Sequence, residues 1–334
     1  MDSHPLILGV ECWPRLAATV AFGTRRVPNG THAEFVAPDG FHPRGCVPFA
    51  LVYRVLVWTS KGGTGKTTTV ANTAPELARL GYSVLMVGFD PQGDLESTFG
   101  IDEDTEDVTR IEELLEGGGD PRAAAVDVPL PTLPRRVPWK RRGSAGRLRL
   151  LACSSQLLAH TAAVARRGYQ DLGRLLSAFE DVDLALIDTQ GALTPISHTA
   201  AHAADGVLFV MEPGYYEFRA LAHRLAELDQ MRHDEGLDIT PLGLLFIRTS
   251  DRSRQMREYR AHFEAPDTLD GQPLHVFQAH TRQQASVRDH PRLQQPTVIA
   301  EPLSHVAEDY RAFASELADH LGKLAKTQAA GSTA

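Results

Sequence analysis

The chain has 334 residues, of which 43% are hydrophobic and 23% are charged. This is the composition of a globular protein, and it excludes a collagen-like, coiled-coil or wholly disordered chain. The 34 lysines and arginines stand against 42 aspartates and glutamates, which gives a net charge of -8. Any nucleic-acid contact must therefore come from a local basic patch rather than from the overall charge.

The cysteines, the histidines and the start of the chain bear on metal sites and on compartment. Cys12, Cys46 and Cys153 lie far apart and form no C-x-x-C pair, so neither a disulfide framework nor a zinc or iron–sulfur site can be built from them. Among the 14 histidines we identify no H-x-x-x-H helix face with a carboxylate partner. The first residues resemble neither a secretory signal nor a membrane span, so we expect a cytoplasmic protein without a membrane partner.

The pattern along the chain predicts an extension, one large domain and a short tail. Residues 1–50 contain six prolines and five glycines and no sustained periodicity, so we expect a weakly ordered extension. Over residues 51–327 short apolar runs alternate with helical stretches, which predicts an α/β fold with helices on both faces of a mostly parallel sheet. The predicted strands are residues 52–58, 83–89, 148–152, 184–187, 207–211 and 242–247. Residues 328–334 carry no apolar anchor and should be disordered.

Residues 116–149 interrupt this rhythm as an insertion that contains prolines and glycines and ends in a basic run. Seven positive charges and no negative charge fall between residues 135 and 149, on Arg135, Arg136, Lys140, Arg141, Arg142, Arg147 and Arg149. Such a run is either a solvated loop or a contact for the phosphate backbone of a nucleic acid.

The strongest chemical signal is a glycine-rich loop between a predicted strand and a predicted helix. It reads Trp-Thr-Ser-Lys-Gly-Gly-Thr-Gly-Lys-Thr-Thr-Thr over residues 58–69. In such a loop the backbone N–H groups surround phosphates, the lysine reaches the outer phosphates, and the next hydroxyl binds magnesium at the start of the helix. The residues predicted to bind a nucleotide are Lys61, Gly62, Gly63, Thr64, Gly65, Lys66, Thr67 and Thr68.

The loop departs from the usual phosphate-binding pattern, because Ser60 stands at the position of a glycine and Lys61 follows it. The form K-G-G-x-G-K-[ST] resembles the ParA/MinD family of P-loop ATPases with a deviant Walker A motif. The resemblance covers residues 52 to about 325 and implies a three-layer α/β/α fold, ATP hydrolysis, ATP and Mg2+ as cofactors and an ATP-dependent homodimer. It also implies that Lys61 reaches the nucleotide of the other subunit, much as an arginine finger does.

Two acids at predicted strand ends complete the site. Asp90 begins the sequence Asp-Pro-Gln-Gly-Asp, which is similar to the end of the family's D-x-D-P-Q-G-N motif and implies that Asp90 orients the attacking water. Asp188 ends an apolar run, as a Walker B acid does, and would hold the magnesium ion. The expected catalytic residues are thus Lys61, Lys66 and Asp90, and the expected metal ligands are Thr67 and Asp188.

Several positions differ from the family pattern. Gly88 replaces the first aspartate of D-x-D, and Asp94 replaces the asparagine after Gln-Gly. Gln190 and Gly191 stand where the family has a Pro-Pro-Gly-type loop. Pro75 falls inside the expected helix after the phosphate loop and should kink it, because proline has no N–H to donate.

The resemblance implies a ParA-type partitioning ATPase that segregates a chromosome, a plasmid or another cargo. Its ATP-bound dimer would bind non-specific DNA, and a ParB-like partner would stimulate hydrolysis. The family's DNA-contacting regions correspond here to segments that contain Arg252, Arg254, Arg257, Arg282 and Arg288. Two alternatives stay open: a nucleotide-dependent regulatory switch with little turnover, and a MinD-like cell-positioning ATPase, against which the brief basic stretch near the C-terminus argues.

Overall fold

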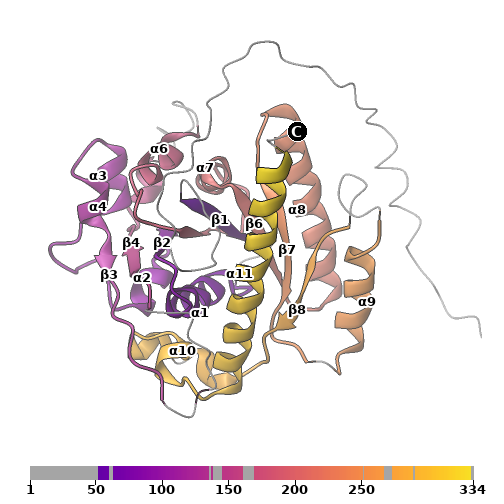
Figure 1. The fold of residues 1–334 in the computed structure, drawn as a ribbon. Helices are drawn as coiled ribbons and strands as arrows, with labels where there is room; N and C mark the ends of the chain where they lie inside the picture. The colour runs from indigo at the N-terminus through magenta and orange to yellow at the C-terminus, as the bar shows by residue number, and fades with distance from the viewer. Residues whose placement is uncertain are drawn as a thin grey trace, which may run out of the picture. The chain divides into compact units, whose positions relative to one another are not determined.

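An eight-stranded sheet forms the centre of the described part of the chain (Figure 1). Its strands are β1 (Tyr53–Trp58), β2 (Val84–Phe89), β3 (Val126–Asp127), β4 (Leu148–Leu151), β5 (Leu184–Thr189), β6 (Gly206–Met211), β7 (Thr240–Phe246) and β8 (Val276–His280). They lie in the order β3-β4-β2-β5-β1-β6-β7-β8. Among these strands only β3 runs antiparallel to its neighbour. The expectation of a mostly parallel sheet is confirmed.

The computed structural model describes residues 52–331, apart from residues 60–62, 135–136, 138–144, 161–168, 251, 267–272 and 289. All of the described residues belong to one unit of the chain, residues 44–334. The predicted extension, residues 1–50, lies outside the described residues, as do the last three residues of the chain.

Helices cover both faces of the sheet and make it the middle of three layers. The described helices are α1 (Lys66–Arg79), α2 (Asp94–Thr98), α3 (Ile111–Leu115), α4 (Pro121–Ala124), α6 (Asp171–Leu176), α7 (Pro195–Ala203), α8 (Tyr215–Asp234), α9 (Arg254–Phe263), α10 (Thr297–Ala300) and α11 (His305–Gly331), with short 3-10 turns at Ala285–Arg288 and His290–Leu293. Apolar residues of α1, α2 and α11 pack on one face, and those of α6, α7, α8 and α9 pack on the other. Within the described residues no helix is long and apolar enough to cross a membrane.

The strand order decides which loops meet. Strand β5 lies between β1 and β2, so that Asp188 is level with Val57 on one side and with Gly88 on the other. The carboxyl ends of these three parallel strands lead into the glycine-rich loop, the segment that begins at Asp90 and the segment that begins at Gln190. Ligands of open parallel α/β sheets bind at such an edge.

Two strands were not predicted. Buried Leu274, Val276 and Phe277 are mixed with exposed His275 and Gln278 in and just before β8, so neither a continuous apolar run nor a strict alternation marks this strand at the edge of the sheet. Strand β3 has only two residues and lies inside the insertion. Such a short segment has no periodicity to read, and its pairing with β4 becomes visible only in the fold.

Helix α1 contains Pro75, as the sequence indicates, and continues past it as far as Arg79. Pro75 is buried, and packing against the sheet compensates for the hydrogen bond that proline cannot donate. Helix α11 runs to Gly331, although the apolar pattern stops near Leu324.

Candidate nucleotide-binding site

The glycine-rich loop connects β1 to the first turn of α1. Gly63 and Gly65 have φ of 72° and 82°, in the left-handed region that glycine adopts without strain. Gly65 is the N-cap residue of α1, and a Cβ atom there would lie 2.6 Å from Ile247 Cδ1. Both the backbone conformation and the close approach of the residue after β7 therefore require glycine at residue 65. Lys61 and Gly62 lie outside the described residues, so their roles stay predictions.

Some side chains of the loop stabilise its conformation, and others are placed where they can contact a ligand. Thr64 Oγ1 donates a hydrogen bond to Thr59 Oγ1 at 2.7 Å, which ties the loop to the residue after β1. Lys66 is the first residue of α1 and is buried, with 6% of its surface exposed. The first turn of α1 also directs unpaired backbone N–H groups and a positive dipole end toward the loop, which favours phosphate.

Asp188 is the most distinctive polar residue of the site. It is 1% exposed, and neither carboxylate oxygen makes a hydrogen bond of good geometry with the described residues. Burial raises the pKa of Asp188 to about 7, whereas the nearby Thr67 hydroxyl and Lys66 ammonium lower it. A buried carboxylate without a hydrogen-bond donor is costly unless a cation or a donor completes it. Thr67 and Asp188, predicted as magnesium ligands, are therefore brought together and form a donor set of the hard oxygen type that Mg2+ prefers.

Asp90 follows the end of β2 and is half-buried. Its Oδ1 accepts a hydrogen bond from the Gln92 backbone N–H at 3.1 Å, and Gly93, with φ of 66°, ends the turn and begins α2. This turn fixes the carboxylate at the edge of the sheet that carries Asp188. Burial raises the pKa of Asp94, the charge of Asp90 adds to this rise, and the Lys66 ammonium opposes it.

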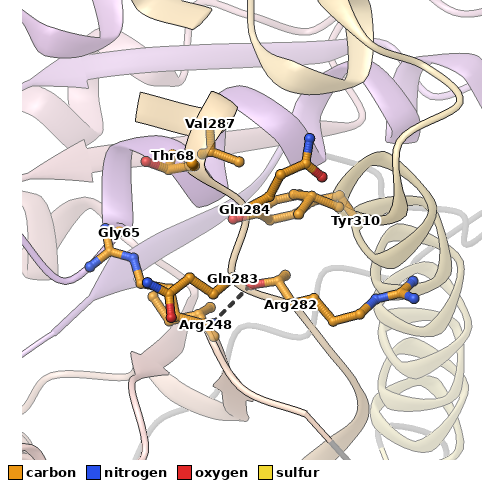
Figure 2. A pocket seen from close by; sticks show the side chains of 12 residues that line it. Gly65, Thr68, Arg248, Arg282, Gln283, Gln284, Val287 and Tyr310 are labelled. Carbon is orange, nitrogen blue, oxygen red and sulfur yellow. Dashed lines mark hydrogen bonds between the residues drawn. The ribbon is translucent and has the colours of Figure 1, made fainter. Parts of the chain in front are cut away.

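A pocket of about 290 Å³ opens beside the glycine-rich loop (Figure 2). Gly65 and Thr68 line one side of it, the segment from Thr281 to Val287 another, and Tyr310 of α11 a third. None of these distal residues was predicted to belong to the site, because they are more than 200 positions away from the loop and carry no motif.

Arg248 joins this pocket to the glycine-rich loop. Its φ of 51° is in the left-handed region, which arginine rarely adopts. Its Nη1 donates to the Gly63 carbonyl at 3.2 Å and lies 3.5 Å from Glu212 Oε2. Backbone conformations of this kind persist where the surrounding structure holds them, often at a functional site.

The basic residues suggested as DNA contacts fall into two groups. Arg147, which is half exposed, pairs with Asp127 at 2.7 Å, and Arg149, which is 3% exposed, pairs with Asp181 at 2.8 Å, so the last two arginines of the basic run form ion pairs at β4. Arg282 likewise pairs with Asp309 at 2.5 Å. Arg252, Arg254 and Arg257 at the start of α9 are exposed, and Arg254 Nε also pairs with Glu258 Oε1 at 2.6 Å. The other five residues of the run and the side chain of Arg288 lie outside the described residues.

The expectation that no H-x-x-x-H helix face meets a carboxylate is wrong. His198 and His202 lie one turn apart on α7, and their Nε2 atoms are 3.6 and 2.7 Å from the Glu235 carboxylate. The ring of Tyr169 stacks on His202, with the centroids 5.2 Å apart. Even so, no group of three histidines, cysteines or acids among the described residues has the geometry to hold a metal ion. We interpret this cluster as a structural contact between α7 and the end of α8.

Comparison with known proteins agrees with this geometry. A family model described as an AAA domain matches residues 54–239. The chromosome-partitioning ATPase Soj of Thermus thermophilus is 32% identical over 218 residues, which cover 64% of this chain and 78% of the relative. The chain belongs to the ParA/MinD family of P-loop ATPases.

Two further comparisons extend the likeness along the chain. The chromosome partitioning protein ParA of Myxococcus xanthus is 25% identical over 283 residues, 82% of this chain and 91% of the relative. The solved structure of apo McdA from Cyanothece has a TM-score of 0.64 at 18% identity and covers 81% of this chain and 100% of its own. The McdA likeness shows that the three-layer ParA/MinD fold holds beyond the region matched by the family model.

Proposed function

We propose that this chain is a ParA-like partitioning ATPase that binds ATP with Mg2+. Gly63, Gly65 and the first turn of α1 would hold the phosphates, and Lys66 would neutralise charge on the outer ones. Thr67 and Asp188 would hold the magnesium ion, which when bound neutralises charge on the phosphate oxygens. The observation that carries this proposal is the buried Asp188 carboxylate, which lies beside Thr67 and makes no hydrogen bond of good geometry with the described residues.

The pocket beside the loop suits the base of the nucleotide. It continues from Gly65 and Thr68, where the phosphates would end, toward Ile247, Gln283 and Gln284. Ile247 offers an apolar stacking surface, and the Gln283 carboxamide offers the paired donor and acceptor that a purine edge requires, whereas the Gln284 carboxamide already donates to Glu301 at 2.8 Å. Arg248 would then lie between base and phosphates, held by the Gly63 carbonyl.

Hydrolysis would depend on Asp90. Its carboxylate is fixed at the edge of the sheet by the Gln92 N–H and keeps a second oxygen for a water molecule. Phosphoryl transfer to water needs a residue that orients the attacking water, and a carboxylate can fill this role. Asp90 would serve this role while Thr67 and Asp188 hold the magnesium ion.

We further propose an ATP-dependent homodimer in which Lys61 reaches the nucleotide of the partner. The dimer would bind DNA without sequence preference and release it after hydrolysis, which a ParB-like protein would stimulate. Support comes from the partitioning proteins among the relatives and from the exposed arginines at the start of α9. Dimerisation doubles the number of these arginines and therefore strengthens binding without a new type of contact.

A nucleotide-dependent switch with little turnover is the second candidate. Gln190, in the loop after Asp188, accepts a hydrogen bond from Thr194 Oγ1 at 3.1 Å and is thus held at the start of α7. A loop held in this way would respond less readily to the terminal phosphate. Turnover distinguishes this candidate from a partitioning ATPase.

The test is the rate of ATP hydrolysis with and without non-specific duplex DNA over a series of salt concentrations, with ATP affinity measured in parallel. We expect Mg2+-dependent ATP binding that Lys66→Ala abolishes and that the matched control Lys326→Ala, an exposed lysine on α11, leaves unchanged. Binding without hydrolysis under every condition would favour the switch. Equal ATP affinity of the parent chain and Lys66→Ala would refute the assignment of the loop.

A further inference from the structure

Gly88 on β2 and Glu96 on α2 occupy one space between them. A Cβ atom at residue 88 would overlap Glu96 Oε1, so the carboxylate stands where a side chain at residue 88 would begin. Glu96 is 2% exposed, and its Oε1 accepts a hydrogen bond from the Cys153 backbone N–H at 2.9 Å. The carboxylate of Glu96, eight positions further along the chain, thus occupies the space that a side chain at residue 88 would need.

This carboxylate lies on the same face of the sheet as Asp188. Gly88 and Asp188 are partners in the register of β2 and β5, and partners on neighbouring parallel strands direct their side chains to the same face. Neighbouring strands are about 4.8 Å apart, so a group placed at the Cβ position of residue 88 is adjacent to the Asp188 side chain.

Two buried carboxylates side by side repel each other and destabilise the fold unless a cation or a proton separates them. Neither oxygen of Asp188 makes a hydrogen bond of good geometry with the described residues, although the Lys66 ammonium lies near it. A divalent cation at Thr67 and Asp188 would satisfy Asp188 and be attracted by Glu96 as well.

We propose that Glu96 is a positioning residue for the magnesium site. Strand β2 has no side chain at Gly88, and the Glu96 carboxylate provides negative charge at that position. It does not replace Asp188 as a ligand, because its Oε1 remains bonded to the Cys153 N–H. Instead it supports the cation and the orientation of Asp188 from the adjacent position. This inference rests on the proposed function, since the cation is the one that accompanies ATP.

The experiment measures how the binding of a fluorescent ATP analogue, N-methylanthraniloyl-ATP, to the full chain depends on Mg2+ concentration. Glu96→Gln keeps the shape and an acceptor for the Cys153 N–H but removes the charge. We expect it to raise the Mg2+ midpoint about tenfold, in the range known for residues that orient metal ligands. Binding in excess EDTA should not change, because the removed charge acts through the cation.

Glu112→Gln is the matched control. Glu112 is also a buried glutamate, 3% exposed, and accepts hydrogen bonds from Ser154, the residue after Cys153. Its charge is not among the causes of the shifted pKa of Asp188. A Glu96→Gln midpoint equal to those of the parent and Glu112→Gln would overturn the proposal and leave Glu96 a structural residue.

A second comparison covers the case in which loss of Glu96 impairs folding. Gly88→Asp together with Glu96→Ala places the carboxylate on the strand and removes the side chain that it would overlap. We expect this pair of substitutions to recover most of the Mg2+ affinity that Glu96→Ala loses. A double variant with no higher Mg2+ affinity than Glu96→Ala would contradict the proposal.

If the parent chain binds no ATP analogue at any Mg2+ concentration, the proposed function fails and this inference fails with it. If the parent chain binds the ATP analogue in a Mg2+-dependent way and the Glu96 variants have the same Mg2+ midpoint, only this inference is overturned.

Discussion

The guanidinium of Arg224 lies over the indole ring of Trp58, with its central carbon 4.5 Å from the ring centroid. Trp58 ends β1 directly before the glycine-rich loop, and Arg224 comes from the middle of α8. Arg224 Nη2 also donates to the Gly191 carbonyl at 2.8 Å. One buried arginine therefore connects the strand before the phosphate loop to the segment after Asp188, and it stabilises both sides of the site.

We predict that Arg224→Lys lowers the free energy of unfolding by about 1–3 kcal/mol, because lysine keeps the charge but not the planar group that stacks on Trp58 while it donates to Gly191. Urea denaturation measures the change. Arg219→Lys is the control, since Arg219 is exposed on the same helix. Equal stability of the two variants would show that the stacked contact contributes nothing.

We predict that Asp90→Ala retains ATP binding and dimer formation but loses hydrolysis by a factor of about 10² to 10⁴, the contribution of a positioned general base or water-orienting group. Phosphate release and sedimentation in the presence of ATP measure the two properties separately. Asp104→Ala, at an exposed acid in the following segment, should hydrolyse ATP at the parent rate. Unchanged turnover in Asp90→Ala would move the catalytic role elsewhere, and loss of the dimer would make Asp90 structural.

Lys61→Ala should leave nucleotide binding by the monomer largely intact and prevent the ATP-dependent dimer. The reason is the residue's place in the sequence, just before the part of the loop that surrounds the phosphates, from which it can reach a facing subunit. Sedimentation velocity with ATP, with Lys326→Ala as control, distinguishes monomer from dimer. A dimer of parent stability would refute the role of Lys61 in trans.

For DNA, two regions remain to be compared, the exposed arginines of α9 and the part of the basic run outside the described residues. We predict that changing Arg252, Arg254 and Arg257 to alanine weakens binding of duplex DNA by the ATP-bound dimer. Each phosphate that an arginine no longer neutralises should also reduce the dependence of log affinity on log salt concentration by about 0.9.

The comparison variant for DNA binding is deletion of residues 135–142, which leaves Arg147 and Arg149 paired with their acids. Whichever variant lowers the salt dependence more identifies the main DNA-binding region. Absence of DNA binding by the parent with ATP near 50 mM salt, where phosphate contacts are strongest, would exclude the partitioning role and favour the switch.

Much of the site could be read from local sequence, because its chemistry depends on neighbouring residues. The glycines, Lys66 and Thr67 act within one loop and one helical turn, and their order is sufficient to predict a phosphate-binding loop. Asp90 and Asp188 could be placed because each follows an apolar strand, and parallel strands end at the same edge of a sheet. The six predicted strands are all present for the same reason, since buried parallel strands are continuous apolar runs.

What the sequence could not determine are contacts between residues whose separation along the chain says nothing about their distance in space. The basic run appeared uniform, yet Arg149 is buried against Asp181 because β4 brings them together. The partner of His198 and His202 could not be predicted, because Glu235 is more than 30 positions away and reaches α7 only at the end of α8. Gly88 appeared to be a lost acid, whereas the tertiary structure places the Glu96 carboxylate in the space it leaves. The order of residues along the chain therefore determined which of them could bind a phosphate. Packing decided which charges are exposed and which are buried beside one another, because burial depends on every element that covers a residue.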